Sequence, residues 1–307
     1  MAPRAPPAAP APQRTVAAAV REQTGFPWTR AKKLCTDGRV TVNGERCTDP
    51  AARIPEDAVV VVDEHAPKQR AGALPESAIV YFDRDVVVVE KPAGMLSVAD
   101  EPGNKDTLGV HARTVLRRLD AGEDVPLAVV HRLDRDTSGV MVFARTPSAQ
   151  RHLAEQFRDH SLVRAYRAIA HGEVPEARME TMLILDRGDG LRGSHGHFRR
   201  PKGEPPTDAR RAVTHVSPLA PLRGATLVEC RLETGRQHQI RIHLAELGHP
   251  LVGERVYIRD YRGAEIESPR PMLHARSLGF VHPRTGKPMF FEREPPADFE
   301  AMLERLG

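Results

Sequence analysis

The stretch "HRLDRDTSG", residues 131–139, decides how the rest of the sequence is interpreted. It holds two aspartates and two arginines between the apolar stretches "VPLAVV" (125–130) and "VMVFA" (140–144). Charged side chains rarely lie so close to a core unless they are paired or used in chemistry. With strands on both sides, the stretch becomes a loop at a sheet edge, closed by Gly139, in which Asp134 can turn inward.

An inward-facing Asp134 allows two interpretations. A buried carboxylate stays ionised only when a cation or several hydrogen-bond donors replace its lost hydration. An ionised aspartate held by one arginine is a good nucleophile or base. The alternative is a structural Asp–Arg pair that ties a turn, and this stretch alone favours neither interpretation.

A second stretch, "LETGRQHQIRIHLAELGHPLVGERVY" (232–257), favours chemistry. It predicts a tight turn at 233–235 that leads into a helix at 236–247. The basic side chains near the start of this helix favour anions and can aim a guanidinium into a site. They are Arg236, His238 and Arg241.

A third stretch, "LVRAYRAI" (162–169), predicts a strand with Arg164 and Tyr166 on one face. A tyrosine in a strand is most often part of a core, so Tyr166 gains meaning only from the other two stretches. An amphipathic run at 148–160 predicts a helix. Strands mixed with helices predict an α+β domain around a mixed or antiparallel sheet. The predicted strands are 78–82, 86–92, 127–130, 139–144, 162–170 and 225–232.

Composition along the chain predicts two domains and a tail. The first 13 residues, rich in Ala and Pro, predict a disordered tail at 1–13. A small basic domain is expected at 14–63 and a polar linker at 64–77. The larger domain is expected at 78–307.

The first part of the small domain is rich in basic residues. Residues 14–54 hold eight Lys or Arg against four Asp or Glu, an excess equal to the net charge of +4 of the whole sequence. Thr29 is expected to cap a short helix that ends at Gly38, and Asn43-Gly44 predicts a hairpin turn. The helix either presents an ordinary solvated face or binds a polyanion.

Other features exclude several classes of protein. Three cysteines without CxxC spacing indicate a reducing cytoplasm, and no run of about 18 apolar residues predicts a membrane span. The Gly-rich, basic segment 186–211 predicts a long mobile loop. Its His195 and His197 lack a nearby set of acids or cysteines, so we expect no metal.

The three stretches together resemble the active-site motifs of the RluA-type pseudouridine synthases: "HRLDRDTSG", "RAYRAI" (164–169) and "LETGRQHQIRIHLAELGHPLVG" (232–253). Residues 86–98 and 272–299 resemble the opening and closing segments of that family, so the resemblance spans about 79–301. It implies a catalytic domain built on a mixed sheet of two pseudo-symmetric halves with a central cleft. It also implies isomerisation of uridine in structured RNA, ribosomal or transfer, a reaction that needs no cofactor because it involves no redox change and no phosphate energy. One chain with both modules is expected to work as a monomer, without a metal or a membrane.

The resemblance assigns a role to five residues. Asp134 matches the essential aspartate that attacks, or takes a proton from, the ribose of the target uridine. Arg241 matches the arginine that pairs with it, and Tyr166 the tyrosine that lies on the uracil ring. Arg132 matches the residue that fills the gap left by the flipped base, and Ile240 would wall the pocket.

The N-terminal domain resembles the small RNA-binding module first described in ribosomal protein S-four. This resemblance implies that basic side chains of the helix and the following turn contact RNA. They are Arg30, Lys32, Lys33 and Arg39.

The sequence departs from the family pattern at several points and leaves two other classes open. Arg164 stands where lysine is expected, a change that keeps the charge. Gly253-Glu254 stands where the family commonly has Gly-Asp, and Tyr257-Ile258 where it commonly has Tyr-Gly. An RNA-binding protein without catalysis would use Asp134 only for structure. A glycosidase-like hydrolase would need a second inward-facing acid, for which only Glu233 offers itself.

Overall fold

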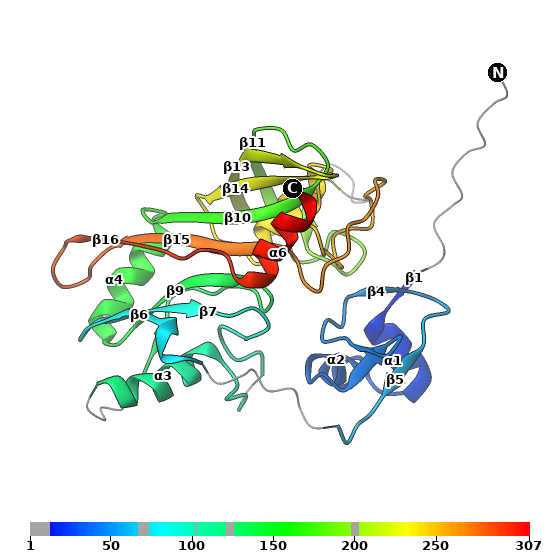
Figure 1. Cartoon of the computed structure of the whole chain (residues 1–307), viewed down its shortest axis with the longest axis horizontal. Coiled ribbons are helices and arrows are strands. Elements are labelled where there is room, and N and C mark those ends of the chain that lie inside the picture. Colours follow the sequence, from blue (N-terminus) through cyan, green and yellow to red (C-terminus); the bar gives the residue numbers. More distant parts are fainter. Residues whose placement is uncertain (1–12, 67–73, 102, 121–125, 198–202) are drawn as a thin grey trace. The chain divides into compact units, whose positions relative to one another are not determined.

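The computed structural model describes residues 13–66, 74–101, 103–120, 126–197 and 203–307, which belong to two compact units, Met1–Arg70 and Ala71–Gly307 (Figure 1). The division between the units falls inside the segment 64–77 that the sequence predicts as a linker. Residues 1–12 of the predicted tail and 67–73 of this linker lie outside the described residues. Gln13, expected in the tail, already belongs to a strand.

Two short helices form the core of the first unit. In α1 (Val16–Thr24) the Thr15 hydroxyl accepts from the N–H of Ala18 at 3.1 Å, and Gly25 ends the helix with a φ of +70°. The second helix, α2 (Trp28–Thr36), follows Pro27 and has no side-chain cap, so the expected cap at Thr29 is wrong. The ring of Pro27 restricts the backbone φ angle just before the helix, so the chain enters the helix in a fixed direction without a capping side chain.

The sheets of the first unit complete its core. The hairpin turn occurs where the sequence predicts it, with positive φ at Asn43 and Gly44. Buried side chains of both helices pack against these strands in one apolar cluster. The strands are β1 (Gln13–Thr15) paired with β4 (Arg53–Pro55), and β3 (Glu45–Arg46), β2 (Val40–Val42) and β5 (Val60–Val62) in one three-stranded sheet.

One eleven-stranded mixed sheet organises the second unit. Its strands follow each other from β11 at the top of Figure 1 to β6 at the bottom, and the α+β architecture is the one the sequence predicts. The central order is β12-β11-β13-β14-β10-β15-β9-β7-β6, with β16 paired to β15 and β8 to β9. The bounds are β6 Ile79–Phe82, β7 Val86–Lys91, β8 Ala128–Val129, β9 Ser138–Ala144, β10 Val163–His171, β11 Ala177–Ile184, β12 Gly193–Ser194, β13 Arg210–Leu222, β14 Ala225–Leu232, β15 Leu273–Val281 and β16 Pro288–Glu292.

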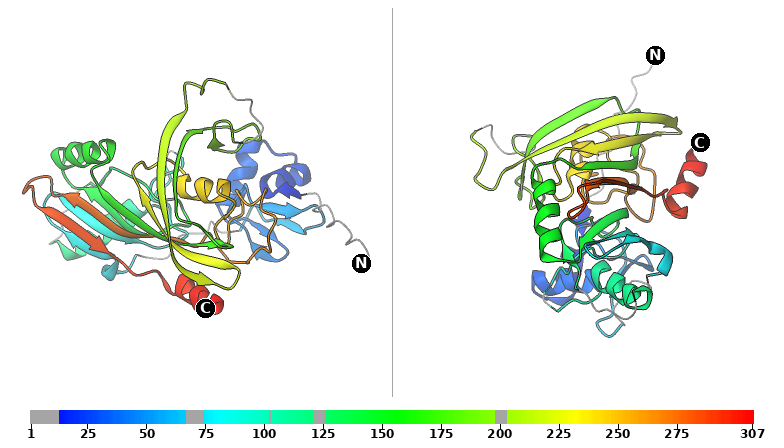
Figure 2. Two further views of the ribbon diagram at one scale, coloured as in Figure 1. Left: turned by 90° about the horizontal axis from the view of Figure 1, so that it is seen from above. Right: turned by 90° about the vertical axis from the view of Figure 1, so that its left-hand side faces the viewer.

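Helices cover both faces of the sheet around β9. Side chains of β9 alternate, so Met141 and Phe143 pack under α3 (Leu108–Leu119) while Val140 and Val142 pack under α4 (Pro147–Arg158). Figure 2 shows these two helices on opposite faces of the strands. A strand covered on both faces is apolar throughout, which explains the apolar flank after the quoted loop.

The other half of the sheet has its own two helices. α5 (Gln239–Glu246) packs Ile240 and Leu244 against β10 and β14, and α6 (Ala297–Leu306) covers a separate apolar cluster. A single 3₁₀ turn (Glu76–Ala78) precedes β6. The predicted helix at 236–247 begins three residues late, because His238 has a left-handed backbone with φ +59°.

The halves join where β9 and β15 run parallel. His274 pairs with Ser138 and Ala275 with Gly139. A Cβ atom on Gly139, whose φ is +122°, would lie 2.2 Å from the carbonyl oxygen of Ala275, so only glycine fits. The loop that carries Asp134 therefore ends at the junction of the two halves.

The segment 186–211 is more ordered than the sequence predicts, apart from 198–202, which lie outside the described residues. Arg187 and Arg259 both form ion pairs with the buried carboxylate of Asp189. Ser194 of β12 donates its N–H and hydroxyl to Glu246 of α5. The expectation of a mobile loop is wrong for these residues, because ion pairs and a short strand fix them.

Candidate active site

The five residues singled out by the sequence line one cavity of about 390 Å³. These residues come from three segments: the loop before β9, the strand β10, and the first turn of α5. Because these segments are distant in the chain, the fold itself brings the residues together. They are Arg132, Asp134, Tyr166, Ile240 and Arg241.

The backbone just before Asp134 is clamped by a serine. The hydroxyl of Ser97 donates to the carbonyl of Leu133 at 2.7 Å and accepts from the N–H of the same residue at 3.0 Å. Leu133 is buried in the cluster under α3. This pair of hydrogen bonds fixes the position from which the side chain of Asp134 leaves the backbone.

The backbone just after Asp134 is held by two cations. The fully buried Lys91 donates its ammonium to the carbonyl of Arg135 at 2.7 Å, and burial lowers the pKa of Lys91 to about 7. Arg270 donates to the carbonyl of Asp136 at 3.1 Å. Sequence reasoning missed Ser97, Lys91 and Arg270 because each acts from outside the motif.

Each carboxylate oxygen of Asp134 faces a different donor. Oδ1 lies 3.8 Å from Nε2 of His238, and Oδ2 lies 3.9 Å from Nη1 of Arg241. Both distances exceed that of a hydrogen bond, and the side chain keeps 18% of its surface exposed. The carboxylate is therefore close to its partners and still accessible to a molecule in the cavity.

Arg241 uses its planar fork for Glu254. Nε and Nη2 donate to the two oxygens of Glu254 at 2.8 and 2.7 Å, and the carboxylate of Glu254 is fully buried. Burial alone would raise the pKa of Glu254, but Arg241 and two backbone N–H donors lower it below its ordinary value. Arg241, which the sequence predicts as the partner of Asp134, thus also binds Glu254. No role was predicted for Glu254.

Tyr166 of β10 lines the same cavity as Ile240 and Arg241 of α5. A bulge in the pairing of β10 with β15 occurs between Ala165 and Tyr166. Burial raises the pKa of Tyr166 to about 12, so its hydroxyl is protonated near neutral pH. The neighbouring Arg164 donates to the carbonyl of Glu233 at 2.8 Å and therefore anchors the strand to the turn.

His131, which opens the quoted stretch, has a structural role. Its Nε2 accepts from the N–H of Val142 at 3.1 Å, and its ring stacks on Phe157 at a centroid distance of 4.4 Å. Burial lowers the pKa of His131 to about 3. The ring is therefore neutral and supports the loop from behind.

The arrangement suits chemistry on a flat ring attached to a sugar. It offers an accessible carboxylate, a neutral tyrosine ring and an arginine already neutralised by Glu254. The acid that a glycosidase would require is not supplied by Glu233, whose carboxylate faces Arg178, Arg211 and His215. That finding argues against the hydrolase alternative.

Comparisons with known proteins decide between the remaining classes. A family model described as RNA pseudouridylate synthase matches residues 85–246. The chain belongs to the RNA pseudouridine synthase family. Members of this family isomerise uridine in RNA to pseudouridine, so the predicted family and the predicted isomerase activity are confirmed. A second model, of the S4 domain, matches residues 29–60 and confirms the RNA-binding module.

Relatives resemble this synthase over most of its length. The ribosomal large subunit pseudouridine synthase D of Zymomonas mobilis is 38% identical over 90% of this chain and 88% of its own. An uncharacterised RNA pseudouridine synthase of Bacillus subtilis is 34% identical over 91% of this chain and 89% of its own. The structure of human RNA pseudouridylate synthase domain containing 4, 24% identical, covers 75% of this chain and 94% of its own with a TM-score of 0.61, and it shows the same fold.

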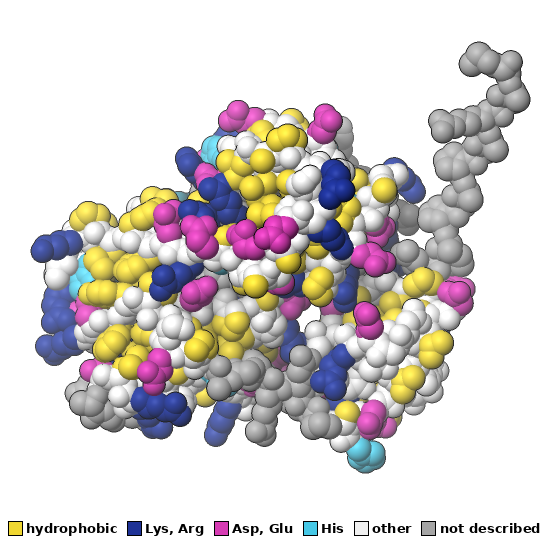
Figure 3. Space-filling model, viewed as in Figure 1, with side chains coloured by type: hydrophobic (Ala, Val, Ile, Leu, Met, Phe, Trp, Pro, Cys, Tyr) yellow, Lys and Arg dark blue, Asp and Glu magenta, His cyan; other side chains and the backbone are white. Residues whose placement is uncertain are grey.

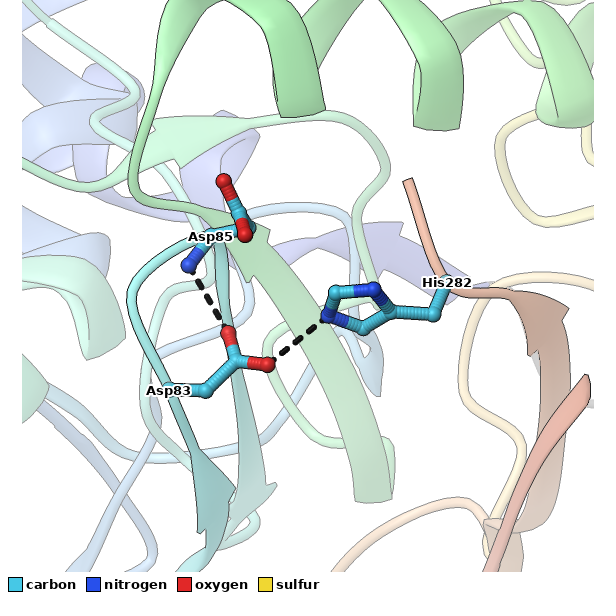
Figure 4. Close-up of side chains that lie close together, drawn as sticks. All are labelled: Asp83, Asp85 and His282. Atoms are coloured by element: carbon cyan, nitrogen blue, oxygen red, sulfur yellow. Dashed lines mark hydrogen bonds and ion pairs between the residues drawn. The ribbon is translucent and has the colours of Figure 1, made fainter. Parts of the chain in front are cut away.

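One cluster of possible metal ligands in the synthase lies outside the cavity. Asp83, Asp85 and His282 bring their ligand atoms within 4.8 Å of one another. Figure 4 shows that Asp83 accepts from the N–H of Asp85 and from Nε2 of His282. Nδ1 of His282 accepts from the N–H of Thr285, and Arg284 pairs with Asp85. Hydrogen bonds and one ion pair of this cluster tie two turns together.

The predicted RNA contacts of the synthase lie on α2 and just after it. Arg30, Lys32 and Lys33 are exposed on the helix, whereas Arg39 is half-buried. Arg30 forms an ion pair with Glu64 at 2.5 Å and lies over the ring of Phe26. In Figure 3 the drawn face of the first unit carries both basic and acidic side chains. Among the described residues, none of the helices has the length and apolar character that crossing a bilayer requires.

Proposed function

We propose that this synthase modifies uridine in the RNA of the large ribosomal subunit, through Asp134. Several relatives at 33–38% identity carry the name ribosomal large subunit pseudouridine synthase D, and they align over most of the chain. The observation that carries the role of Asp134 is its position, accessible in the cavity between two donors. Transfer RNA is the alternative substrate.

The proposed reaction rearranges bonds within one nucleotide. Asp134 attacks the ribose or removes a proton from it, and the bond between the ribose and N1 of uracil breaks. The uracil rotates in the cavity and its C5 bonds to the ribose. At that stage the bond between Asp134 and the ribose breaks, or the proton that Asp134 took returns to the ribose. C5 then loses its proton and N1 of the uracil gains one. Atoms and electrons balance without an oxidant or a phosphate donor, so the proposal includes no cofactor or metal.

The cavity residues hold the base during this rotation. Tyr166 lies on one face of the uracil and Ile240 on the wall beside it. Arg132, which is exposed at the rim, fills the gap that the base leaves in the RNA. Taking a base out of its stack costs a few kcal/mol, which these contacts and the basic module offset.

A map of pseudouridines tests the proposal. RNA from cells with and without the synthase is compared, and the purified protein is incubated with unmodified ribosomal and transfer RNA. We expect pseudouridine to be lost from large-subunit RNA without the synthase and formed by the purified protein. Loss from transfer RNA alone would contradict the ribosomal assignment. We also propose that the synthase works in the cytoplasm as a monomer, since one chain holds both units.

Tyr166→Phe is expected to reduce the rate of isomerisation at least tenfold with RNA affinity nearly unchanged. The ring that lies on the base is retained. The lost hydroxyl, which is protonated near neutral pH, can take the proton from C5 only as it gives up its own, and this relay is what the variant removes. Single-turnover rates and RNA titrations measure the two effects. Tyr81→Phe removes a hydroxyl that binds Asp83, away from the cavity, and serves as the control. A near-normal rate in Tyr166→Phe would exclude the hydroxyl as the proton acceptor.

Removing residues 1–70 is expected to leave a folded catalytic unit that selects its RNA poorly. The larger compact unit begins at Ala71, and the removed part carries Arg30, Lys32 and Lys33. The salt slope of binding should fall by roughly one for every phosphate that the truncated protein no longer neutralises. RNA affinity is measured across a salt series for the full chain and the truncation. Superimposable curves would mean that the basic module does not touch RNA.

A further inference from the structure

His238 lines the cavity in a backbone conformation that few residues other than glycine adopt. Its φ is +59°, and it directly precedes the first residue of α5. Such a conformation persists only where the surroundings fix it. Here the side chain of Gln239 fixes the turn, because its Oε1 accepts from the hydroxyl of Thr234 at 2.8 Å and from the N–H of Arg236 at 3.0 Å.

The two ring nitrogens of His238 face different neighbours. Nδ1 lies 2.8 Å from the hydroxyl of Tyr257, and Nε2 lies 3.8 Å from Oδ1 of Asp134. If Tyr257 donates to Nδ1, the hydrogen of the neutral ring is on Nε2 and is directed towards the carboxylate. The other tautomer would direct a lone pair at a negatively charged oxygen, so the first arrangement is favoured.

The charges around His238 keep its ring neutral. Burial lowers the pKa of His238, the carboxylates of Asp134 and Glu254 oppose this only in part, and Arg241 and Arg192 lower the pKa further. A neutral imidazole carries a hydrogen on only one of its two nitrogens. If Nδ1 accepts a hydrogen bond from its partner, that hydrogen is on Nε2 and can be donated to Asp134.

Tyr257 is held by the same carboxylate that holds Arg241. The N–H of Tyr257 lies 3.3 Å from Oε1 of Glu254, and its ring faces the guanidinium of Arg241 at 5.4 Å. Burial raises the pKa of Tyr257, so its hydroxyl keeps the proton that it donates. Glu254 therefore helps to fix both donors that face Asp134. It binds Arg241 directly, and it acts on His238 through Tyr257.

We propose that His238 is a positioning residue for Asp134, donating from Nε2 to Oδ1 when RNA closes the cavity, with its tautomer set by Tyr257. Arg241 holds the other oxygen, and the two donors together fix the plane of the carboxylate relative to the ribose. Catalytic hydrogen bonds are often long in a free enzyme and shorten in the complex, which accounts for the distance of 3.8 Å. The inference rests on the proposed role of Asp134.

The test compares two amides at position 238. The amide nitrogen of Gln reaches the place of Nε2, whereas that of Asn reaches only the place of Nδ1 and cannot meet Asp134. We expect His238→Ala and His238→Asn each to lower kcat about 100-fold, and His238→Gln to recover at least tenfold of that loss. KM, RNA affinity and Tm should stay near wild type in all three. Equal rates in the Gln and Asn variants, or a wild-type rate in the Ala variant, would overturn the proposal.

A double-variant cycle tests the route through Tyr257. Tyr257→Phe should lower kcat about tenfold alone and have no further effect in the His238→Ala background. Multiplying losses would show that Tyr257 does not act through His238. Pseudouridine formation by the wild-type protein is measured in parallel, so a failure of the proposed reaction is seen separately from a failure of the role of His238.

Discussion

Asp134→Asn is expected to abolish isomerisation, with a loss of at least about a thousandfold, while RNA affinity stays within about threefold. The amide keeps the shape of the side chain, so the surface that binds RNA is unchanged. It removes the negative charge that attacks the ribose or takes its proton. Pseudouridine formation on ribosomal RNA measures the first quantity, and a binding titration measures the second.

A matched replacement separates the role of Asp134 from a general effect of lost charge. Asp159→Asn changes an exposed aspartate at the end of α4, 61% of whose side chain is exposed, and should leave the rate unchanged. Turnover of the Asp134→Asn variant within tenfold of wild type would remove Asp134 from the mechanism.

Arg241→Ala is expected to reduce both the rate and the stability of the catalytic unit. Stability should fall because the loss of Arg241 leaves the fully buried carboxylate of Glu254, and not that of Asp134, without its main partner. The cost of such an uncompensated charge is on the order of 3–5 kcal/mol in the free energy of unfolding. Arg241→Lys should recover only part of it, because a single ammonium replaces a two-pronged fork. Denaturant unfolding and single-turnover rates measure the two effects.

Two further variants separate stability from catalysis at Arg241. The double change Arg241→Met with Glu254→Leu removes both buried charges and should regain most of the stability without regaining activity. Arg231→Ala removes an exposed arginine of β14 and should change the free energy of unfolding by no more than about 0.5 kcal/mol. An Arg241→Ala variant as stable and active as wild type would show that neither carboxylate depends on this guanidinium.

The sequence predicts the parts of this site that depend on local pattern. Apolar stretches on both sides of 131–139 place the loop between strands, and the three motifs name the side chains of the cavity. The structure brings these side chains into one cavity, as the family resemblance implies. Their roles in the reaction stay predictions that the variants above test.

What the sequence could not give depends on contacts between distant segments. Glu254 attracts notice only as a departure from the family pattern, and nothing in its neighbourhood shows that it becomes fully buried against Arg241. The support of the Asp134 loop by Lys91 and Ser97 comes from a segment about 40 residues earlier, since the hydrogen bonds span 44 and 36 positions. The left-handed backbone of His238 depends on the hydrogen bonds around Gln239. Helical periodicity in the sequence predicts instead that His238 lies inside the helix.

The parallel pairing of β9 with β15 has a consequence for synthesis on the ribosome. The hydroxyl of Ser138, beside the Asp134 loop, contacts His274, a residue 136 positions later. At roughly 5–20 residues per second, the loop waits on the order of ten seconds for its partner strand to be made. The N-terminal unit can fold long before then, because all its strands lie within the first 62 residues. The nascent chain is therefore able to hold RNA before it is able to modify it, and the order of translation itself delays catalysis until the strand that contains His274 has been made.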